Sequence, residues 1–260
     1  MTLPSLIGMV HLGPLPGSPR FDGNLDRVIA RAASDAIMLK DAGFDALLIE
    51  NFGDAPFFAG TVPPVTVAAV TRAAHSVIDA TSCSLGINVL RNDGVAALAI
   101  ASATGATFIR VNVLSGLMFT DQGPITGQAA EIARRRREWC PDVLIMADVM
   151  VKHSSPPPGL TLEQAGIDTA GRGGADALIV SGPGTGLAPD PDEGRRLRKA
   201  LPEALIYVGS GATVANVAEL ATFANGVIVG SALKFEGLAQ NSVDPFSAQA
   251  FRQAAAGAGW

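Results

Sequence analysis

The chain has 260 residues, 48% of them hydrophobic, and a formal net charge of −5 at pH 7. The negative charge argues against nonspecific binding to nucleic acid, and the apolar runs are too short for an integral membrane segment, which needs about 18 to 20 uncharged residues. The first residues lack the basic region and cleavage site of a secretory signal, so we expect a cytoplasmic protein. Cys83 and Cys140 lie far apart in the chain, which is typical of reduced, structural thiols.

Short apolar runs alternate with amphipathic segments about every thirty residues, which predicts eight successive βα units. We expect strands at Leu6–Val10, Ala46–Glu50, Ser84–Val89, Phe108–Val113, Val143–Asp148, Ala177–Val180, Leu205–Val208 and Val227–Val229. We expect helices near Asn24–Ala42, Val65–Ala80, Gly94–Ala103, Ile125–Trp139, Leu162–Gly171, Asp190–Ala200, Val214–Ala221 and Pro245–Ala256. No break in composition separates these units, so residues 1–260 are predicted to form a single domain.

The expected strands are almost continuously apolar, as in a parallel sheet that helices cover. Eight βα units in about 250 residues predict the α/β class and a (β/α)8 barrel, the TIM barrel. In this architecture the active site lies at the C-terminal ends of the strands. Polar residues at those positions are therefore candidates for the site.

The strand ends supply most of the candidate site residues. These are His11, Glu50, Asn88, Arg110, Asn112, Asp148 and Ser181, with Lys152 shortly after the fifth strand. Arg110 and Asn112 are two residues apart, so their side chains point to the same face of the strand. Because a buried guanidinium needs an anionic partner, we place both in the site as substrate-binding residues, with Asn88 and Ser181. A structural ion pair inside the barrel would also explain Arg110.

Four residues are candidates for the chemistry. Asp148 ends a buried strand at the rim and is the predicted general base, and Glu50 and His11 join it as catalytic candidates. Lys152 is either a Schiff-base nucleophile or a cation that holds a phosphate. His11 and His153 could each transfer protons or make structural hydrogen bonds only. No compact ligand motif favours a metal ion, although Glu50, Asp148 and His11 could share one, and no cofactor is predicted.

Two glycine turns follow consecutive strands late in the chain. One contains Gly209, Ser210 and Gly211, and the other contains Gly230 and Ser231. Such turns present backbone N–H groups to an anion, and (β/α)8 barrels place their phosphate site after these last strands. We therefore expect a phosphorylated small-molecule ligand, although glycines that only turn the chain would give the same pattern.

Three loops at the barrel mouth are longer than usual, at Asn51–Pro64, Ser115–Pro124 and Val149–Leu160. The first contains Phe52, Phe57 and Phe58, which would either cover the ligand or pack against a second subunit in a homo-oligomer. A fourth loop, Ser181–Gly186, is rich in glycine and is predicted to form a third wall of the phosphate pocket.

Several segments together resemble the BtpA/SgcQ family. They are Ile7–Leu12 with Pro14–Gly17, Glu50–Asp54, Gly86–Asp93, Arg110–Asn112, Ala147–Val149 with Lys152 and His153, and Val208–Gly211. The resemblance spans nearly the whole chain. It implies a barrel similar to the ribulose-phosphate-binding group, with Gly211, Gly230 and Ser231 as phosphate contacts. It also implies a link, in photosynthetic relatives, to photosystem I biogenesis, and it assigns no chemical step to any residue.

Two hypotheses follow for the function. The first is an enzyme that performs isomerase or lyase chemistry on a phosphorylated small metabolite by proton transfer. The second is a non-catalytic assembly or biogenesis factor that binds another protein. The concentration of acids, bases and amides at one rim favours the enzyme.

Overall fold

The computed structural model describes residues 3–182 and 184–260, so position 183 of the Ser181–Gly186 loop lies outside the described residues. Eight parallel strands in the described part close into a barrel in the order β1-β11-β10-β9-β7-β4-β3-β2. These strands are β1 (Leu6–His11), β2 (Ala46–Glu50), β3 (Ser84–Asn88), β4 (Phe108–Val111), β7 (Leu144–Val149), β9 (Ala177–Val180), β10 (Ile206–Val208) and β11 (Gly226–Val229). The predicted (β/α)8 barrel is confirmed.

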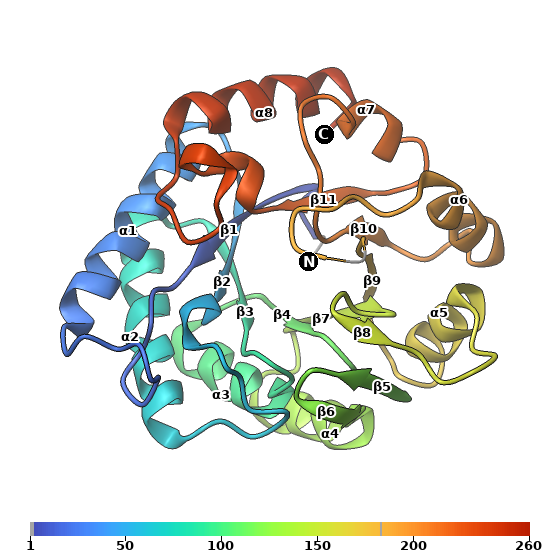
Figure 1. Cartoon of the computed structure of the whole chain (residues 1–260), viewed down its shortest axis with the longest axis horizontal. Helices are drawn as coiled ribbons and strands as arrows, with labels where there is room; N and C mark the ends of the chain where they lie inside the picture. The colour runs from blue at the N-terminus through green and yellow to red at the C-terminus, as the bar shows by residue number, and fades with distance from the viewer. Residues whose placement is uncertain (1–2, 183) are drawn as a thin grey trace.

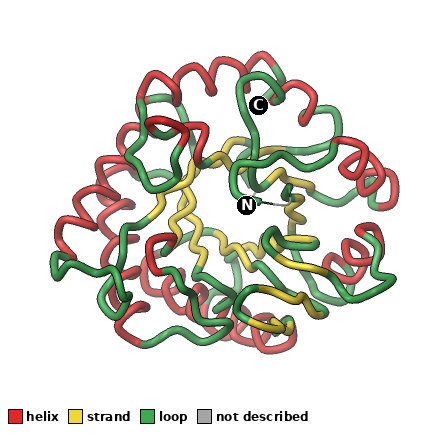
Figure 2. The backbone as a smooth tube through the Cα atoms, viewed as in Figure 1, coloured by secondary structure: helices red, strands yellow, loops and turns green. Residues whose placement is uncertain are grey.

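The helices form an outer ring around the strands, as Figure 1 and Figure 2 show. Within the described residues they are α1 (Leu25–Asp41), α2 (Pro64–Thr81), α3 (Gly94–Thr104), α4 (Ala129–Trp139), α5 (Leu162–Ala170), α6 (Pro191–Ala200), α7 (Val217–Leu220) and α8 (Pro245–Gly257). None of the helices described is long and apolar enough to cross a membrane. Three short 3-10 helices also lie in loops: η1 (Phe52–Asp54), η2 (Ser231–Leu233) and η3 (Phe235–Gly237).

The barrel interior is apolar in its lower part and polar at its mouth. Residues such as Met9, Leu48, Phe108, Met146 and Ile179 form a buried apolar cluster inside the ring of strands. Because side chains alternate along a strand, the residue two positions after each of these apolar residues also points into the barrel. These next residues are His11, Glu50, Arg110, Asp148 and Ser181. The alternation of side chains along each strand therefore places a layer of polar residues directly above the apolar core.

Three regions differ from the prediction: the segment from the end of β4 to the start of α4, the loop after β7, and helix α7. The expected loops after β4 and β7 contain a three-stranded antiparallel sheet, made of β5 (Leu117–Thr120), β6 (Gly123–Thr126) and β8 (Ser154–Ser155). Ile125 therefore lies in a strand and not in a helix, and α4 begins only at Ala129. Ile125 is buried with Val113, Met118 and Val151, so packing between distant segments decides its conformation. Helix α7 is also shorter than predicted.

Candidate functional site

The ion pair between Arg110 and Asp148 occupies the centre of the polar layer. Arg110 donates from Nε and Nη2 to the two Asp148 oxygens at 2.9 and 2.8 Å, and the two side chains are only 2% and 0% exposed. Asn112 Nδ2 and the Ser181 hydroxyl each donate to the same carboxylate at 3.1 Å. Burial opposes the charge of Arg110, but the charge and hydrogen bonds of Asp148 outweigh it and raise the pKa of Arg110.

This geometry argues against the predicted role of Asp148 as general base. Four donors already occupy its two oxygens, and a base needs a free lone pair within reach of the substrate proton. Asn88 also turns inward, since its Nδ2 donates to the Arg110 carbonyl at 3.0 Å and to Asn112 Oδ1 at 3.3 Å. Asp148 therefore holds the Arg110 side chain in place, Asn112 and Ser181 hold Asp148, and Asn88 bonds to the Arg110 backbone and to Asn112.

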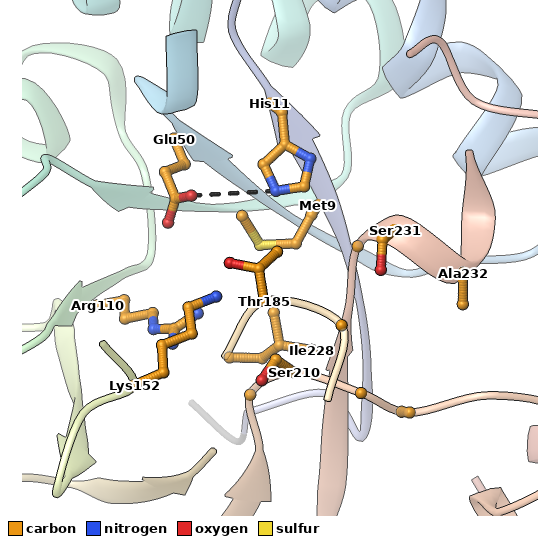
Figure 3. Close-up of a pocket in the computed structure, with 15 residues that line it drawn as sticks. Met9, His11, Glu50, Arg110, Lys152, Thr185, Ser210, Ile228, Ser231 and Ala232 are labelled. Carbon is orange, nitrogen blue, oxygen red and sulfur yellow. Dashed lines mark ion pairs between the residues drawn. The ribbon is translucent and has the colours of Figure 1, made fainter. Parts of the chain in front are cut away.

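The other candidates surround one pocket at the mouth, between β1, β2 and the turns after β10 and β11 (Figure 3). The predicted residues that line it are His11, Glu50, Arg110, Lys152, Gly209, Ser210, Gly211, Gly230 and Ser231. Met9, Thr185 and Gly186 line it as well. Both glycine turns thus reach the pocket that Glu50 and Lys152 also line.

Backbone atoms of the two glycine turns form one side of the pocket. The N–H groups of Gly211, Ala212, Ser231 and Ala232 have no hydrogen-bond acceptor within residues 3–182 and 184–260, and all four residues line the pocket. Gly211 has a φ of +75°, and a Cβ there would lie 2.1 Å from Ala188 N. A glycine is therefore required, both by the left-handed conformation and by the close approach of the loop after β9.

Glu50 and His11 also line the pocket, and His11 lies beside the second glycine turn, since a Cβ at Gly230 would lie 3.0 Å from His11 Cε1. The side chains of Glu50 and His11 are each 8% exposed, and His11 Nε2 lies 4.0 Å from Glu50 Oε1, beyond hydrogen-bond distance (dashed line in Figure 3). Burial, together with the positive charges of Lys234, Lys152 and Arg110, holds the pKa of His11 well below 6.5. His11 is therefore neutral at neutral pH, and Glu50 is the pocket-lining carboxylate that no strong donor occupies within the described residues.

Lys152 enters the pocket from the loop after β7. The loop holds two non-glycine residues in the left-handed region, Met150 and His153, with φ values of 53° and 57°. Such conformations cost energy and are common where a side chain must be aimed at a site. Burial, followed by the charge of Arg110, lowers the pKa of Lys152, while Glu50 partly opposes this shift.

A second, wider cavity of about 480 Å³ adjoins the pocket and shares Glu50, Lys152 and Thr185 with it. Phe52, Phe57, Arg91, Asp121 and His153 are among its other lining residues. Its volume is that of an ordinary small-molecule site. Of the phenylalanines predicted to cover a ligand, Phe52 and Phe57 line this cavity, whereas Phe58 is 57% exposed.

Some site-lining residues were not predicted individually, although their loops, Ser181–Gly186 and Ser115–Pro124, were predicted to lie at the barrel mouth. Thr185 belongs to the glycine-rich loop, and Asp121 and Gln122 form the tip of the β5–β6 hairpin. The sequence Asp121-Gln122-Gly123, between two segments rich in apolar residues, is a hairpin signal that could have identified this element. In the part of the chain that the structure describes, no three His, Cys, Asp or Glu side chains lie close enough together to hold a metal ion.

Known proteins resemble this chain in both sequence and fold. Photosystem I biogenesis protein BtpA of Synechocystis sp. is 47% identical over 251 residues, which cover 96% of this chain and 88% of the relative. An uncharacterized protein of Thermococcus kodakarensis is also 47% identical, over 92% of this chain and 90% of its own.

Two solved structures share the barrel. The one described as "Native KDPGal structure" has a TM-score of 0.62 at 19% identity and covers 99% of this chain and 97% of its own. Thiamine phosphate pyrophosphorylase of Pyrococcus furiosus has a TM-score of 0.60 at 11% identity, covering 98% and 96%. At these identities the likeness concerns the fold alone. The model of the BtpA family, in contrast, matches residues 2–257, and this protein therefore belongs to the BtpA family.

Proposed function

We propose that this protein is an enzyme that binds a phosphorylated small metabolite at the barrel mouth and transfers a proton on it, in an isomerase or lyase reaction. One observation carries the proposal. A single pocket is lined by two glycine turns, in which four backbone N–H groups have no acceptor among the described residues, and by Glu50 and Lys152. Anion recognition and acid–base groups thus lie within the reach of one small ligand.

In this proposal the phosphate binds at the glycine turns. Backbone N–H groups without an internal acceptor are strong donors for phosphate oxygens, and they keep their geometry because the turns follow adjacent strands β10 and β11. Arg110 lines the same pocket, and because only its Nε and Nη2 donate to Asp148 within the described residues, its Nη1 would donate to the ligand. The rest of the metabolite would extend into the wider cavity.

In this proposal the general base is Glu50, in place of Asp148, which was predicted for this role from its position at a strand end. Glu50 lines both the phosphate pocket and the wider cavity, so it faces the ligand at the junction between its phosphate and its body. Negative charge that develops on the substrate when a proton is removed would be stabilised by Lys152 and Arg110. His11, which is neutral beside Glu50, would transfer or orient the proton.

The phosphate site can be tested by ligand-induced thermal stabilisation. Orthophosphate and glycerol 3-phosphate should raise the melting temperature of the wild-type protein, because a ligand that binds only the native state stabilises it. Ser231→Asp places a carboxylate beside the phosphate position and should abolish the increase. Ser231→Ala, the matched control, keeps the backbone donor and should retain it. An equal increase in the folded Ser231→Asp variant would contradict the phosphate site.

A second candidate function rests on the relative from Synechocystis, which is named a photosystem I biogenesis protein. On this hypothesis the barrel acts by binding another protein and does no chemistry. Substitution of Glu50 distinguishes the two candidates. A binding protein would keep its partner function in Glu50→Gln, whereas the proposed enzyme would lose turnover.

A further inference from the structure

The Lys152 amine lies where the phosphate pocket meets the wider cavity, because Lys152 lines both. Figure 3 shows its side chain beside that of Arg110, with the amine directed into the pocket. Val151, the preceding residue, is buried in the apolar cluster under the β5–β6–β8 sheet. The anchored neighbour and the two left-handed residues around it direct Lys152 toward the ligand.

Lys152 is half-buried, and its amine has no ion-pair or hydrogen-bond partner within the described residues, unlike the buried cations Arg110 and Lys234. Arg110 is paired with Asp148, and Lys234 is paired with Asp35. The groups that act on the amine are Arg110 and Arg91, which disfavour its protonation, and Glu50 and Asp148, which favour it. Burial is the largest influence, so the pKa of Lys152 lies below 10.5 and the fraction of neutral amine is increased. A neutral amine is a nucleophile, whereas an ammonium is not.

We propose that Lys152 is a catalytic nucleophile that forms an imine with a carbonyl group of the phosphorylated substrate. This inference deepens the function proposed above, since it rests on the same site and defines the substrate class as phosphorylated aldehydes or ketones. The glycine turns hold the phosphate at one end, so the carbonyl lies beside the amine at the junction of the two cavities. A cation that only held the phosphate would have no need to line the wider cavity.

The step balances as a condensation. The Lys152 nitrogen bonds to the carbonyl carbon, and the carbonyl electron pair moves to oxygen, which takes up a proton. The nitrogen then loses its protons, the oxygen leaves as water, and a carbon–nitrogen double bond remains. Glu50, which lines the same junction, accepts the proton from nitrogen and returns it to the departing oxygen. Once protonated, the imine draws electrons from the neighbouring C–H bond, whose proton Glu50 accepts.

The test is borohydride trapping with dihydroxyacetone phosphate, because borohydride reduces an imine to a stable secondary amine. The chain has only four lysines, namely Lys40, Lys152, Lys199 and Lys234, so the modified residue can be mapped without ambiguity by peptide mass spectrometry. Lys40 and Lys199 are exposed and report nonspecific labelling. We expect one adduct, on Lys152. Glycerol 3-phosphate, which has the phosphate but no carbonyl, should compete, and dihydroxyacetone without phosphate should label far less.

Three variants complete the test. Lys152→Met and Lys152→Arg should lose the adduct while keeping the thermal stabilisation by glycerol 3-phosphate, and Lys199→Met should behave as wild type.

Other outcomes would contradict one proposal or the other. If glycerol 3-phosphate stabilises the wild-type protein but no adduct forms on Lys152, the imine is overturned and the phosphate site is supported. If Lys152→Met also lost that stabilisation, Lys152 would be a phosphate-binding cation. If glycerol 3-phosphate does not reduce the yield of the adduct on Lys152, the result would support the imine and contradict the phosphate site. If the wild-type protein shows neither an adduct nor stabilisation, both the imine and the phosphate site are overturned.

Discussion

Glu50 and Asp148 are both strand-end carboxylates in the polar layer, but their surroundings give them different tasks. Asp148 accepts from Arg110, Asn112 and Ser181 and is fully buried. Glu50 accepts no hydrogen bond from a side chain within the described residues, lies 4.0 Å from His11, and lines both ligand cavities. One carboxylate therefore fixes a guanidinium, and the other is free to accept a proton.

Substitution of the two carboxylates should separate these tasks. Glu50→Gln should leave the stability near that of the wild type and reduce proton transfer by the roughly 10²–10⁴-fold that general-base catalysis supplies. Asp148→Asn should instead destabilise the fold by about 3–5 kcal/mol, because it leaves Arg110 buried without its counter-charge. The measurements are urea unfolding and the exchange of carbon-bound protons of dihydroxyacetone phosphate in D₂O, followed by NMR. A stable, inactive Asp148→Asn with an active Glu50→Gln would reverse the assignment.

His11 should make the protein sensitive to acid. Its folded pKa lies well below 6.5, so between these two values the unfolded chain binds a proton that the native state does not. Stability should therefore fall as the pH drops below 6.5, by at most about 1.4 kcal/mol per pH unit. His11→Gln should flatten this slope in urea titrations at several pH values. His75→Gln is the control, since the His75 side chain is 69% exposed, and an unchanged slope in His11→Gln would refute the prediction.

The conformation of the loop after β7 is fixed by its contacts with strand β5 and with a buried apolar cluster. Strand β8 pairs with β5, so the loop that carries Lys152 is joined to the hairpin that carries Asp121. Beneath this sheet, Val113, Met118, Ile125 and Val151 form a small buried cluster. The antiparallel sheet thus fixes one wall of the wider cavity, which a free loop would not do.

The segment after β11 is held by a buried ion pair. Lys234, three residues after Ser231, donates from Nζ to Asp35 Oδ2 at 2.9 Å, and Asp35 Oδ1 accepts from Val243 N at 2.9 Å. Burial lowers the pKa of Lys234, although Asp35 opposes the shift. Helix α1 therefore positions the second glycine turn through Asp35.

Removal of this ion pair should loosen the turn. Asp35→Asn leaves Lys234 buried without a counter-charge and should cost about 3–5 kcal/mol in urea unfolding. The folded variant should also bind orthophosphate more weakly, because Ser231 lies in the released segment. Asp26→Asn in the same helix breaks only an exposed pair with Arg72 and should change little. Equal effects of the two substitutions would show that the buried pair has no special role.

At the scale of the whole molecule, barrel closure assembles the site from both ends of the chain. Strand β1 pairs with β2 and with β11, so His11 and Glu50 come to line the same pocket as the last two glycine turns. The interior also needs small residues at set positions. At Gly86 a Cβ would lie 2.1 Å from the Phe108 ring, so a glycine lets that ring fill the barrel.

The barrel, the strand ends and the glycine turns could all be predicted from the amino-acid sequence. Apolar runs, their spacing and glycines at strand ends are local patterns, and local patterns are sufficient to place His11, Glu50 and Arg110 at one rim. The pairing of Asp148 with Arg110, and the lack of a partner for the Lys152 amine among the described residues, became visible only in the folded chain. Arg110 and Asp148 are 38 residues apart, and the antiparallel sheet joins two separate loops. Such contacts depend on side-chain geometry between distant segments, which no periodicity within one segment encodes.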